Sequence, residues 1–266
     1  MIADLTTIPP SPNDEFEAGR ILTPETVAWL DGQFGNMTTE EVLAWTWLRF
    51  GPRAAIGTSF QAAGLLMIDM ARKNGFDFPV FTLDTGVLFP ETIALKERLE
   101  KFYDFKIESL VPDISVEKQE EVHGPALWNR DPDLCCTMRK VLPLRDKLRD
   151  LDCWITGLRR QQSTTRAGIG MIELYQFSDS PVKDIVKVNP VANWSREEVW
   201  TYVRSNNIPY NPLHDAGYRS IGCTHCTRKS AHDPDERAGR WAGSRKVECG
   251  IHTFMERRHL APGLTT

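Results

Sequence analysis

The sequence lacks the segments that would direct a protein into a membrane or out of the cell. No run of about 18 uncharged apolar residues occurs anywhere, and no basic stretch followed by an apolar run stands at the amino terminus. There is no internal repeat and no low-complexity tract. We therefore expect a cytoplasmic globular protein without membrane contact. In a reducing compartment, paired cysteines more often bind metal or do redox chemistry than form disulfides.

The sequence also has little net charge. Its 266 residues carry a formal charge of -4 at pH 7, which gives no general reason to expect nucleic acid as a partner. With 41% hydrophobic and 26% charged residues, the composition is that of an ordinary globular protein. The chain is long enough for one large domain with a tail, and any anion-binding site has to be local.

Hydrophobic periodicity predicts alternating strands and helices. Strands are expected at 53–59, 79–83, 105–110 and 153–156, with strand-like segments at 171–175 and 185–188. Helices are expected at 24–34, 40–50, 62–73, 90–102 and 196–205, with Thr23 and Ser195 as N-caps. Another helix can begin at Asp131-Pro132, and Pro143 is expected to break it. The alternation predicts an α/β fold with a mostly parallel sheet flanked by helices, followed by a loop-rich tail.

Two loops at the expected carboxyl ends of strands suit a nucleotide. Residues 57–61 (GTSFQ) follow the first strand and open a helix, where amide and hydroxyl donors could hold an anion. Residues 83–86 (LDTG) follow the second strand and could receive an adenine edge. Neither loop is a Walker A or dinucleotide motif, and each alone is also consistent with a plain turn.

Basic residues gather in the loops near the same sheet edge. They are Arg139, Lys140, Arg159, Arg160, Arg166, Arg228, Lys229, Arg237 and Arg240. An anionic ligand is their natural use, and solvated surface charge is the alternative. The spacing of three between Arg237 and Arg240 would put both on one face of a helical turn.

Four of the six cysteines form two pairs, Cys135-Cys136 and Cys223 with Cys226. Adjacent cysteines are poor ligands for structural zinc, whose ligand pairs are usually two to four residues apart. An iron–sulfur cluster tolerates closer pairs, and four cysteines match its ligand set. Zinc, four buried apolar cysteines and a disulfide between Cys135 and Cys136 remain the alternatives.

The fifth cysteine, Cys249, stands alone near Lys246, His252 and a basic stretch at 257–259. Such neighbours would favour a reactive thiolate in an exposed tail, and a buried inert cysteine is the competing interpretation. The sixth, Cys153, is expected in the core. The histidines at 123, 214, 225 and 232 are treated as structural because none has a ligand-spaced partner.

Taken together, the motifs resemble those of the assimilatory adenylyl-sulfate reductases, thioredoxin-dependent enzymes related to phosphoadenylyl-sulfate reductases. Between about residues 53 and 252 these motifs are SFQ, LDTG with FPET, CCTMRK with VLPL, TGLRRQQSTTR, PYNPLHDAGYRSIGC, CTHCTR, ERAGRW and ECGIH. The chain departs from the family pattern in the Thr-His between Cys223 and Cys226, where Glu-Pro is frequent.

The resemblance implies a Rossmann-like, adenine-nucleotide α-hydrolase-like fold. It also implies one 4Fe-4S cluster held by Cys135, Cys136, Cys223 and Cys226. By the same resemblance Cys249 attacks the sulfur of adenosine 5′-phosphosulfate, and AMP leaves. A thioredoxin or glutaredoxin-like dithiol then releases sulfite from the S-sulfocysteine, in sulfate assimilation toward cysteine.

Further residues are assigned by this resemblance alone. The phosphosulfate is expected to contact Lys140, Arg237, Arg240 and His252, with Arg166 nearby, and the nucleotide to contact Ser59, Leu83 and Gly157. Residues 1–22 would form a flexible arm, 23–232 the nucleotide-binding and iron–sulfur domain, and 233–266 a mobile tail. A homo-oligomer is expected. Three alternatives are reduction of the 3′-phosphorylated nucleotide, an adenylating ATP pyrophosphatase of related fold, and a non-enzymatic iron–sulfur sensor.

Overall fold

The computed structural model describes residues 22–179, 181–230, 235–243 and 246–259. Within these residues one seven-stranded sheet has the order β3-β2-β1-β4-β6-β5-β7. The strands are β1 (Ala54–Gly57), β2 (Val80–Leu83), β3 (Ile107–Leu110), β4 (Cys153–Thr156), β5 (Ile172–Phe177), β6 (Lys183–Val188) and β7 (Glu256–Arg257). The first five in spatial order pair in parallel, and β5 is antiparallel to both of its neighbours. The predicted α/β class with a mostly parallel sheet is confirmed.

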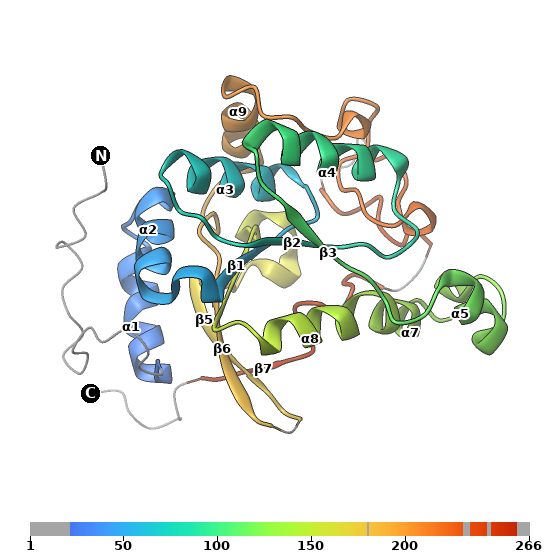
Figure 1. Cartoon of the computed structure of the whole chain (residues 1–266), viewed down its shortest axis with the longest axis horizontal. Helices are drawn as coiled ribbons and strands as arrows, with labels where there is room; N and C mark the ends of the chain where they lie inside the picture. The colour runs from blue at the N-terminus through green and yellow to red at the C-terminus, as the bar shows by residue number, and fades with distance from the viewer. Residues whose placement is uncertain (1–21, 180, 231–234, 244–245, 260–266) are drawn as a thin grey trace.

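Helices cover both faces of this sheet. They are α1 (Pro24–Phe34), α2 (Thr39–Phe50), α3 (Ala62–Lys73), α4 (Pro90–Tyr103), α5 (Val116–His123), α6 (Leu127–Arg130), α7 (Pro132–Cys136), α8 (Leu142–Arg149) and α9 (Arg196–Ser205). Figure 1 shows α3, α4 and α9 on one side of the sheet and α7 and α8 on the other. The predicted bounds of α1, α3 and α9 are confirmed, whereas α5, α6 and β7 were not anticipated.

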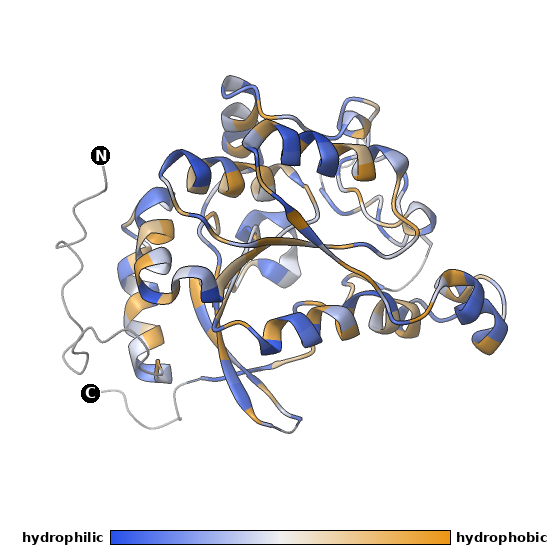
Figure 2. Cartoon of the chain, in the orientation of Figure 1, coloured by the Kyte–Doolittle hydropathy of each residue, from blue (hydrophilic) through white to orange (hydrophobic). Residues whose placement is uncertain are grey.

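The core lies in two layers, one on each face of the sheet. Helix α3 is buried along nearly its whole length, residues 62–71, and packs with α2, α4 and α9 against one face. The other face is covered by α8, through Leu144 and Leu148, and by Met255 of the tail. In Figure 2 the apolar sides of the helices turn toward the sheet and the hydrophilic sides turn outward. One sheet with two covered faces makes this a single domain.

The strand order reverses between β1 and β4, which lie side by side and in parallel near the centre of the sheet. Strand β1 leads outward to β2 and β3 on one side, and β4 leads toward β6 and β5 on the other. Ligands of open α/β sheets bind beyond the carboxyl ends of the strands at such a switch point. At this point Gly157 lets the end of β4 approach α3, because a Cβ there would come within 3.2 Å of the Ala63 Cβ and the Gly64 nitrogen.

Pro143 does not break the helix as predicted. A π-helical turn (Thr137–Val141) joins α7 to α8, and the Leu142 amide donates to the Thr137 carbonyl five residues back. Pro143 then lies in the first turn of α8, where a missing N–H is tolerated. The wider turn buries Arg139 and Lys140. Such turns are frequent at functional sites.

The tail returns to the edge of the sheet. Strand β7 pairs with β5, and the Arg258 amide donates to the Leu174 carbonyl at 2.9 Å. The predicted boundary at residue 233 and the arm at 1–21 lie outside the described residues, while Leu22 packs in the core. The mobility of the tail stays a prediction. Across the described part of the chain, no helix is long and apolar enough to cross a membrane.

A buried carboxylate joins three helices on the outer layer. Asp69 of α3 is 2% exposed and accepts from the Tyr103 and Tyr202 hydroxyls, each at 2.8 Å, and from Lys73 at 2.7 Å.

Asp69→Ala would leave both hydroxyls without their acceptor, so we expect a loss of about 3 kcal/mol in the free energy of unfolding. Asp77→Ala is the control, because Asp77 also forms an ion pair, with Arg72, but is 73% exposed; it should cost about 0.5 kcal/mol or less. Equal losses in urea unfolding would contradict this account.

Candidate functional site

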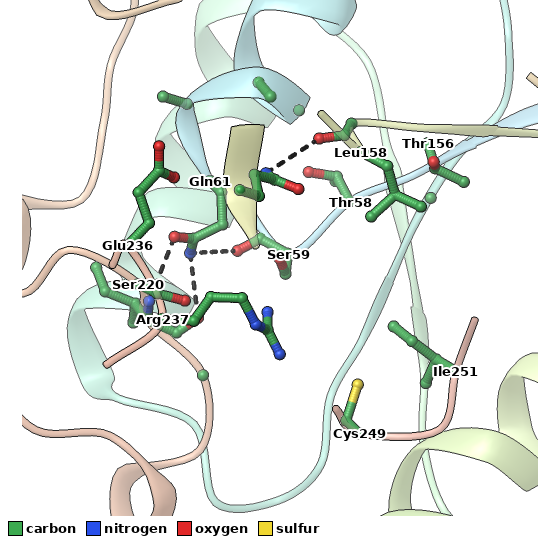
Figure 3. Close-up of a pocket in the computed structure, with 18 of the residues that line it drawn as sticks. Thr58, Ser59, Gln61, Thr156, Leu158, Ser220, Glu236, Arg237, Cys249 and Ile251 are labelled. Atoms are coloured by element: carbon green, nitrogen blue, oxygen red, sulfur yellow. Dashed lines mark hydrogen bonds between the residues drawn. The ribbon is translucent and has the colours of Figure 1, made fainter. Parts of the chain in front are cut away.

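A single cavity at the switch point collects all nine residues predicted to act in catalysis or substrate binding. Its lining includes Ser59, Leu83, Lys140, Gly157, Arg166, Arg237, Arg240, Cys249 and His252. These residues come from the loops after β1, β2 and β4, from the π-helical turn and from the tail. Figure 3 shows Cys249 and Arg237 pointing into the same open space, with Ser59 and Thr156 on the sheet side. The sequence therefore predicted the members of the site, and their roles stay predictions.

The loop after β1 is held rigidly. Phe60 has a left-handed backbone, φ 57°, which is uncommon for a residue with a side chain. Thr58 Oγ1 stabilises this turn by accepting from the Phe60 amide at 2.9 Å. Gln61 exchanges hydrogen bonds with the backbone of Ile221, at 3.1 and 3.3 Å. The loop predicted to bind an anion is thus joined to the segment that precedes Cys223.

Lys140 lies between two groups of thiols. Its side chain is buried, and burial acts to lower its pKa, but the negative charges of Cys223 and Cys249 outweigh burial and leave the Lys140 pKa raised. Burial alone would raise the pKa of Cys223, yet Lys140, the Thr85 hydroxyl and Arg240 together hold it below its ordinary value. The two shifts agree, because Lys140 and Cys223 each favour the charged form of the other.

Two of the predicted arginines share one carboxylate from the tail. Arg166 donates to Glu248 through Nε and Nη2, both at 3.0 Å, and Arg237 donates to the same carboxylate through Nη2 at 3.0 Å. Burial, followed by the charge of Arg166, lowers the pKa of Arg237 to about 10. Glu248 is the first residue of the ECGIH motif, but the sequence analysis gave it no role.

Arg240 lies against the backbone near Cys226. Its Nε donates to the Cys226 carbonyl at 3.3 Å, and its guanidinium sits 4.6 Å from the centre of the Trp241 ring. A Cβ on Gly222 would collide with this guanidinium, so a side chain there would displace the end of Arg240. Arg237 and Arg240 both reach the cavity, as their spacing suggested.

Other basic residues of the predicted group serve the fold. Arg139 is buried and donates to the Thr85 carbonyl at 2.6 Å and to Gln119 at 3.1 Å, which fixes the loop after β2. Arg159 lines the cavity but forms a bidentate pair with Glu236, at 2.7 and 2.8 Å. The sequence analysis considered only two roles for these basic residues, anion binding and solvated surface charge. The structure adds a third role, because a buried arginine can also donate to backbone carbonyls.

His252 packs flat on Trp154 of β4, with ring centres 5.1 Å apart and an angle of 18°. Its Nδ1 is buried and has no hydrogen-bond partner within the described residues. Burial, together with the positive charges of Lys187, Arg166 and Arg237, holds the pKa of His252 well below its ordinary 6.5. The ring is therefore neutral near pH 7, and its open nitrogen is free to meet a ligand.

The four paired cysteines surround a second, smaller cavity. Cys135 and Cys136 from α7 and Cys223 and Cys226 from the loop all line it, together with Lys140. All six cysteines are free thiols, so the disulfide alternative at Cys135-Cys136 is wrong. Cys153 is fully buried in β4, as predicted.

The donor set of this second cavity suits a polynuclear cluster. In the described residues no three His, Cys, Asp or Glu side chains converge closely enough to hold a single metal ion. The four thiols line one cavity, and four cysteines match the ligand set of an iron–sulfur cluster, which stays a prediction. Burial and the neighbouring thiols raise the pKa of Cys135, which favours its neutral thiol form.

One aromatic pair beside these cysteines was missed. His225, treated as structural from the sequence, stacks on Trp128 with ring centres 4.0 Å apart and an angle of 6°. Both rings line the cysteine cavity. Sequence spacing had no signal for this contact, because Trp128 lies in α6, which the periodicity did not predict.

The docked state of His252 makes tail packing depend on pH. A ring free in solution has the ordinary pKa of 6.5 and the docked ring a lower one, so the undocked tail binds a proton first as the pH falls. Docking is then fully favoured above pH 6.5 and weakens below it. We expect about tenfold faster amide exchange for residues 250–258 at about pH 5.5 than at about pH 7.5, after correction for intrinsic rates.

His252→Gln should abolish this pH dependence, whereas His259→Gln, at an exposed histidine of the same tail, should keep it. Hydrogen exchange read by mass spectrometry measures all three proteins. An unchanged pH dependence in His252→Gln would assign it to another group.

Comparison with known proteins shows the family to which the chain belongs. Residues 53–229 match the phosphoadenosine phosphosulfate reductase domain. The chain is 41% identical over 213 residues to "Adenosine 5′-phosphosulfate reductase 2" of Bacillus subtilis, covering 80% of this chain and 88% of that protein. It is 40% identical over 230 residues to "Phosphoadenosine 5′-phosphosulfate reductase" of Gloeobacter violaceus, covering 85% and 93%.

A solved structure confirms the fold. The phosphoadenylyl-sulfate reductase of Candida auris, in a phosphate complex, superposes with a TM-score of 0.69 at 30% identity, covering 79% of this chain and 99% of that one. The matched region spans the loops after β1, β2 and β4 and both cysteine pairs. The chain belongs to the phosphoadenosine phosphosulfate reductase family.

Proposed function

We propose that this protein reduces adenosine 5′-phosphosulfate to sulfite and AMP in sulfate assimilation toward cysteine. One observation carries the proposal: the lone tail cysteine, Cys249, lies in a cavity at the switch point that is also lined by Lys140, Arg166, Arg237 and Arg240. A thiol facing a cluster of cations suits attack on an electrophile that carries negative charge. The names of the curated relatives support this substrate class.

The proposed first step is a displacement at sulfur. The Cys249 thiolate forms a bond to the sulfur of the substrate's sulfate group, and the bond from that sulfur to the phosphate oxygen breaks. AMP leaves with the electron pair, and Cys249 becomes S-sulfocysteine. Cations should stabilise the charge that develops on the departing phosphate, which is the role proposed for Lys140, Arg237 and Arg240.

The second step needs an external dithiol. A thiolate of a thioredoxin or glutaredoxin-like protein attacks the Cys249 sulfur, sulfite leaves, and a mixed disulfide remains. The second thiol of the reductant resolves this disulfide and restores Cys249. The dithiol thus supplies both electrons. The cytoplasmic location and the homo-oligomer expected from the sequence stay predictions.

In the proposed reaction Cys249 must be accessible twice, first to the substrate and then to the protein reductant. In the described state Cys249 faces the cavity (Figure 3) and is partly buried. A protein reductant reaches it only if neighbouring contacts open, such as the pairing of Lys246 with Asp133 and the stacking of His252 on Trp154. This requirement supports the proposal that the tail moves during turnover.

A 4Fe-4S cluster is proposed on Cys135, Cys136, Cys223 and Cys226. Bound there, it would join α7 to the loop that precedes Arg237 and would set the electrostatic potential at Lys140. Cys223 and Lys140 line both cavities, so thiolate charge at the second cavity acts directly on a cation of the first. No electron needs to pass through the cluster, because the dithiol reduces the adduct.

Cys249→Ser tests the nucleophile. We expect sulfite formation to fall by about a thousandfold or more, because a hydroxyl at this position is a far weaker nucleophile. Wild-type protein given adenosine 5′-phosphosulfate without reductant should release AMP and gain a sulfonate on the peptide that contains Cys249, as measured by mass spectrometry.

Cys153→Ala is the matched control, since Cys153 lines neither cavity, and it should keep wild-type turnover. The proposal fails if Cys249→Ser still forms sulfite at the wild-type rate. Release of pyrophosphate from ATP without sulfite would instead support an adenylating enzyme, and absence of any turnover would support a sensor. The same assay with the 3′-phosphorylated nucleotide compares kcat/KM for the two substrates named among the relatives.

Cys136→Ser tests the cluster. Wild-type protein purified without oxygen should contain about four iron atoms and as many sulfides per chain, with visible absorption that Cys136→Ser loses. Cys153→Ala should retain the iron. Zinc in place of iron, or full iron in Cys136→Ser, would overturn the ligand assignment.

A further inference from the structure

A tail carboxylate already neutralises the arginines that the substrate is proposed to meet. Glu248 accepts hydrogen bonds from Arg166 Nε and Nη2 and from Arg237 Nη2, all at 3.0 Å, and from the Thr165 hydroxyl at 3.3 Å. The side chain of Glu248 is 17% exposed, and those of Arg166 and Arg237 are 11% and 14% exposed. A charge-assisted, bidentate contact of this kind is among the stronger hydrogen-bond pairs.

Each nitrogen of the Arg166 guanidinium already donates to a protein acceptor. Its Nε and Nη2 are held by Glu248, and its Nη1 donates to Gln162 Oε1 at 2.6 Å. Yet Arg166 lines the cavity together with Arg237. An anion can therefore take the bidentate Nε and Nη2 face of Arg166 only by replacing Glu248.

The arginine pair carries more charge than one carboxylate neutralises. Two guanidiniums face Glu248, and the repulsion from Arg166 is one cause, after burial, of the lowered pKa of Arg237. Burial acts to raise the pKa of Glu248, but the hydrogen bonds and charge of Arg166 and the charge of Arg237 hold it below its ordinary value. A group with two negative charges would complete the neutralisation that a single carboxylate leaves unfinished.

We propose that Glu248 is an internal counter-ion that an entering dianion displaces from Arg166 and Arg237. This inference rests on the proposed function for the identity of the dianion, a phosphosulfate. Glu248 is a positioning residue in this scheme, since it acts through the two arginines.

The displacement need not release Cys249, the next residue. Contacts on both sides of it are independent of the arginine pair: Lys246 pairs with Asp133, and His252 stacks on Trp154. Glu248 can therefore turn away from the arginines while these flanking contacts keep Cys249 over the cavity. Glu248 and the entering anion compete for the two arginines, and Cys249 keeps its position.

Direct binding measurements with Glu248→Gln test the proposal. The amide keeps the shape of the side chain and removes its charge, so the internal competitor is weakened. We expect about tenfold tighter binding of inorganic pyrophosphate, and of adenosine 5′-phosphosulfate in a Cys249→Ser background. The reason is that the state in which residue 248 does not occupy Arg166 and Arg237 becomes more populated. Isothermal titration calorimetry measures both ligands.

Asp184→Asn is the matched control. Asp184 also holds the tail through an arginine, Arg258, at 2.6 Å, but it lies outside the cavity lining. The substitution makes the same change in net charge and loosens the tail at its other end, so pyrophosphate affinity should stay at the wild-type value. Unchanged or weaker anion binding in Glu248→Gln overturns the proposal, and so does an equal gain in Asp184→Asn.

The two ligands separate this inference from the proposed function. Tighter pyrophosphate binding in Glu248→Gln, with no binding of the phosphosulfate by either protein, would sink the substrate assignment and keep the counter-ion. Normal sulfite formation by the wild type, with no gain in affinity in Glu248→Gln, would sink the counter-ion and keep the substrate.

Discussion

The candidate site depends on the neutralisation of positively charged side chains that are buried away from water. Lys140 and Arg166 are each 9% exposed, and Arg237 is only slightly more accessible. Taking one charge out of water costs several kcal/mol unless an opposite charge and good hydrogen bonds compensate. The fold supplies that compensation from two sources, the thiols beside Lys140 and the carboxylate of Glu248. A cavity lined in this way is prepared for an anion, whether from the protein or from a ligand.

The backbone explains why these cations meet. Strands β1 and β4 end side by side at the switch point, and Gly157 allows the end of β4 to approach the first turn of α3. The π-helical turn between α7 and α8 buries two residues that are adjacent in sequence, Arg139 and Lys140. Their side chains make different contacts. Arg139 holds the backbone of the loop after β2, whereas Lys140 faces both cavities. One local irregularity thus couples the cysteine cavity to the anion site.

The tail is held by polar anchors at a distance from its cysteine. Arg257 of β7 pairs at 2.8 Å with Glu173, which is 1% exposed and also faces Lys187. Burial lowers the pKa of Lys187 to about 8, although the charge of Glu173 opposes the shift. The positive field of Lys187 contributes in turn to the neutral state of His252. The ion pair of Arg257 with Glu173 is therefore linked to the His252 ring through the charge of Lys187. Both contacts help to fix the position of the tail that carries Cys249.

The sequence by itself indicated the helices and strands whose periodicity is strong, nine of the residues that line the first cavity, the four paired cysteines that line the second, and the separation of Cys249 from those pairs. Local signals sufficed for these: caps such as Thr23 and Ser195, runs of buried residues, and ordered motifs. The tertiary structure alone decided which charge meets which. Glu248, Glu236 and Asp184 bind arginines 82, 77 and 74 residues away, and β7 depends on pairing with β5. Such contacts have no spacing to detect, because ion pairs form between whatever side chains the packed elements bring together.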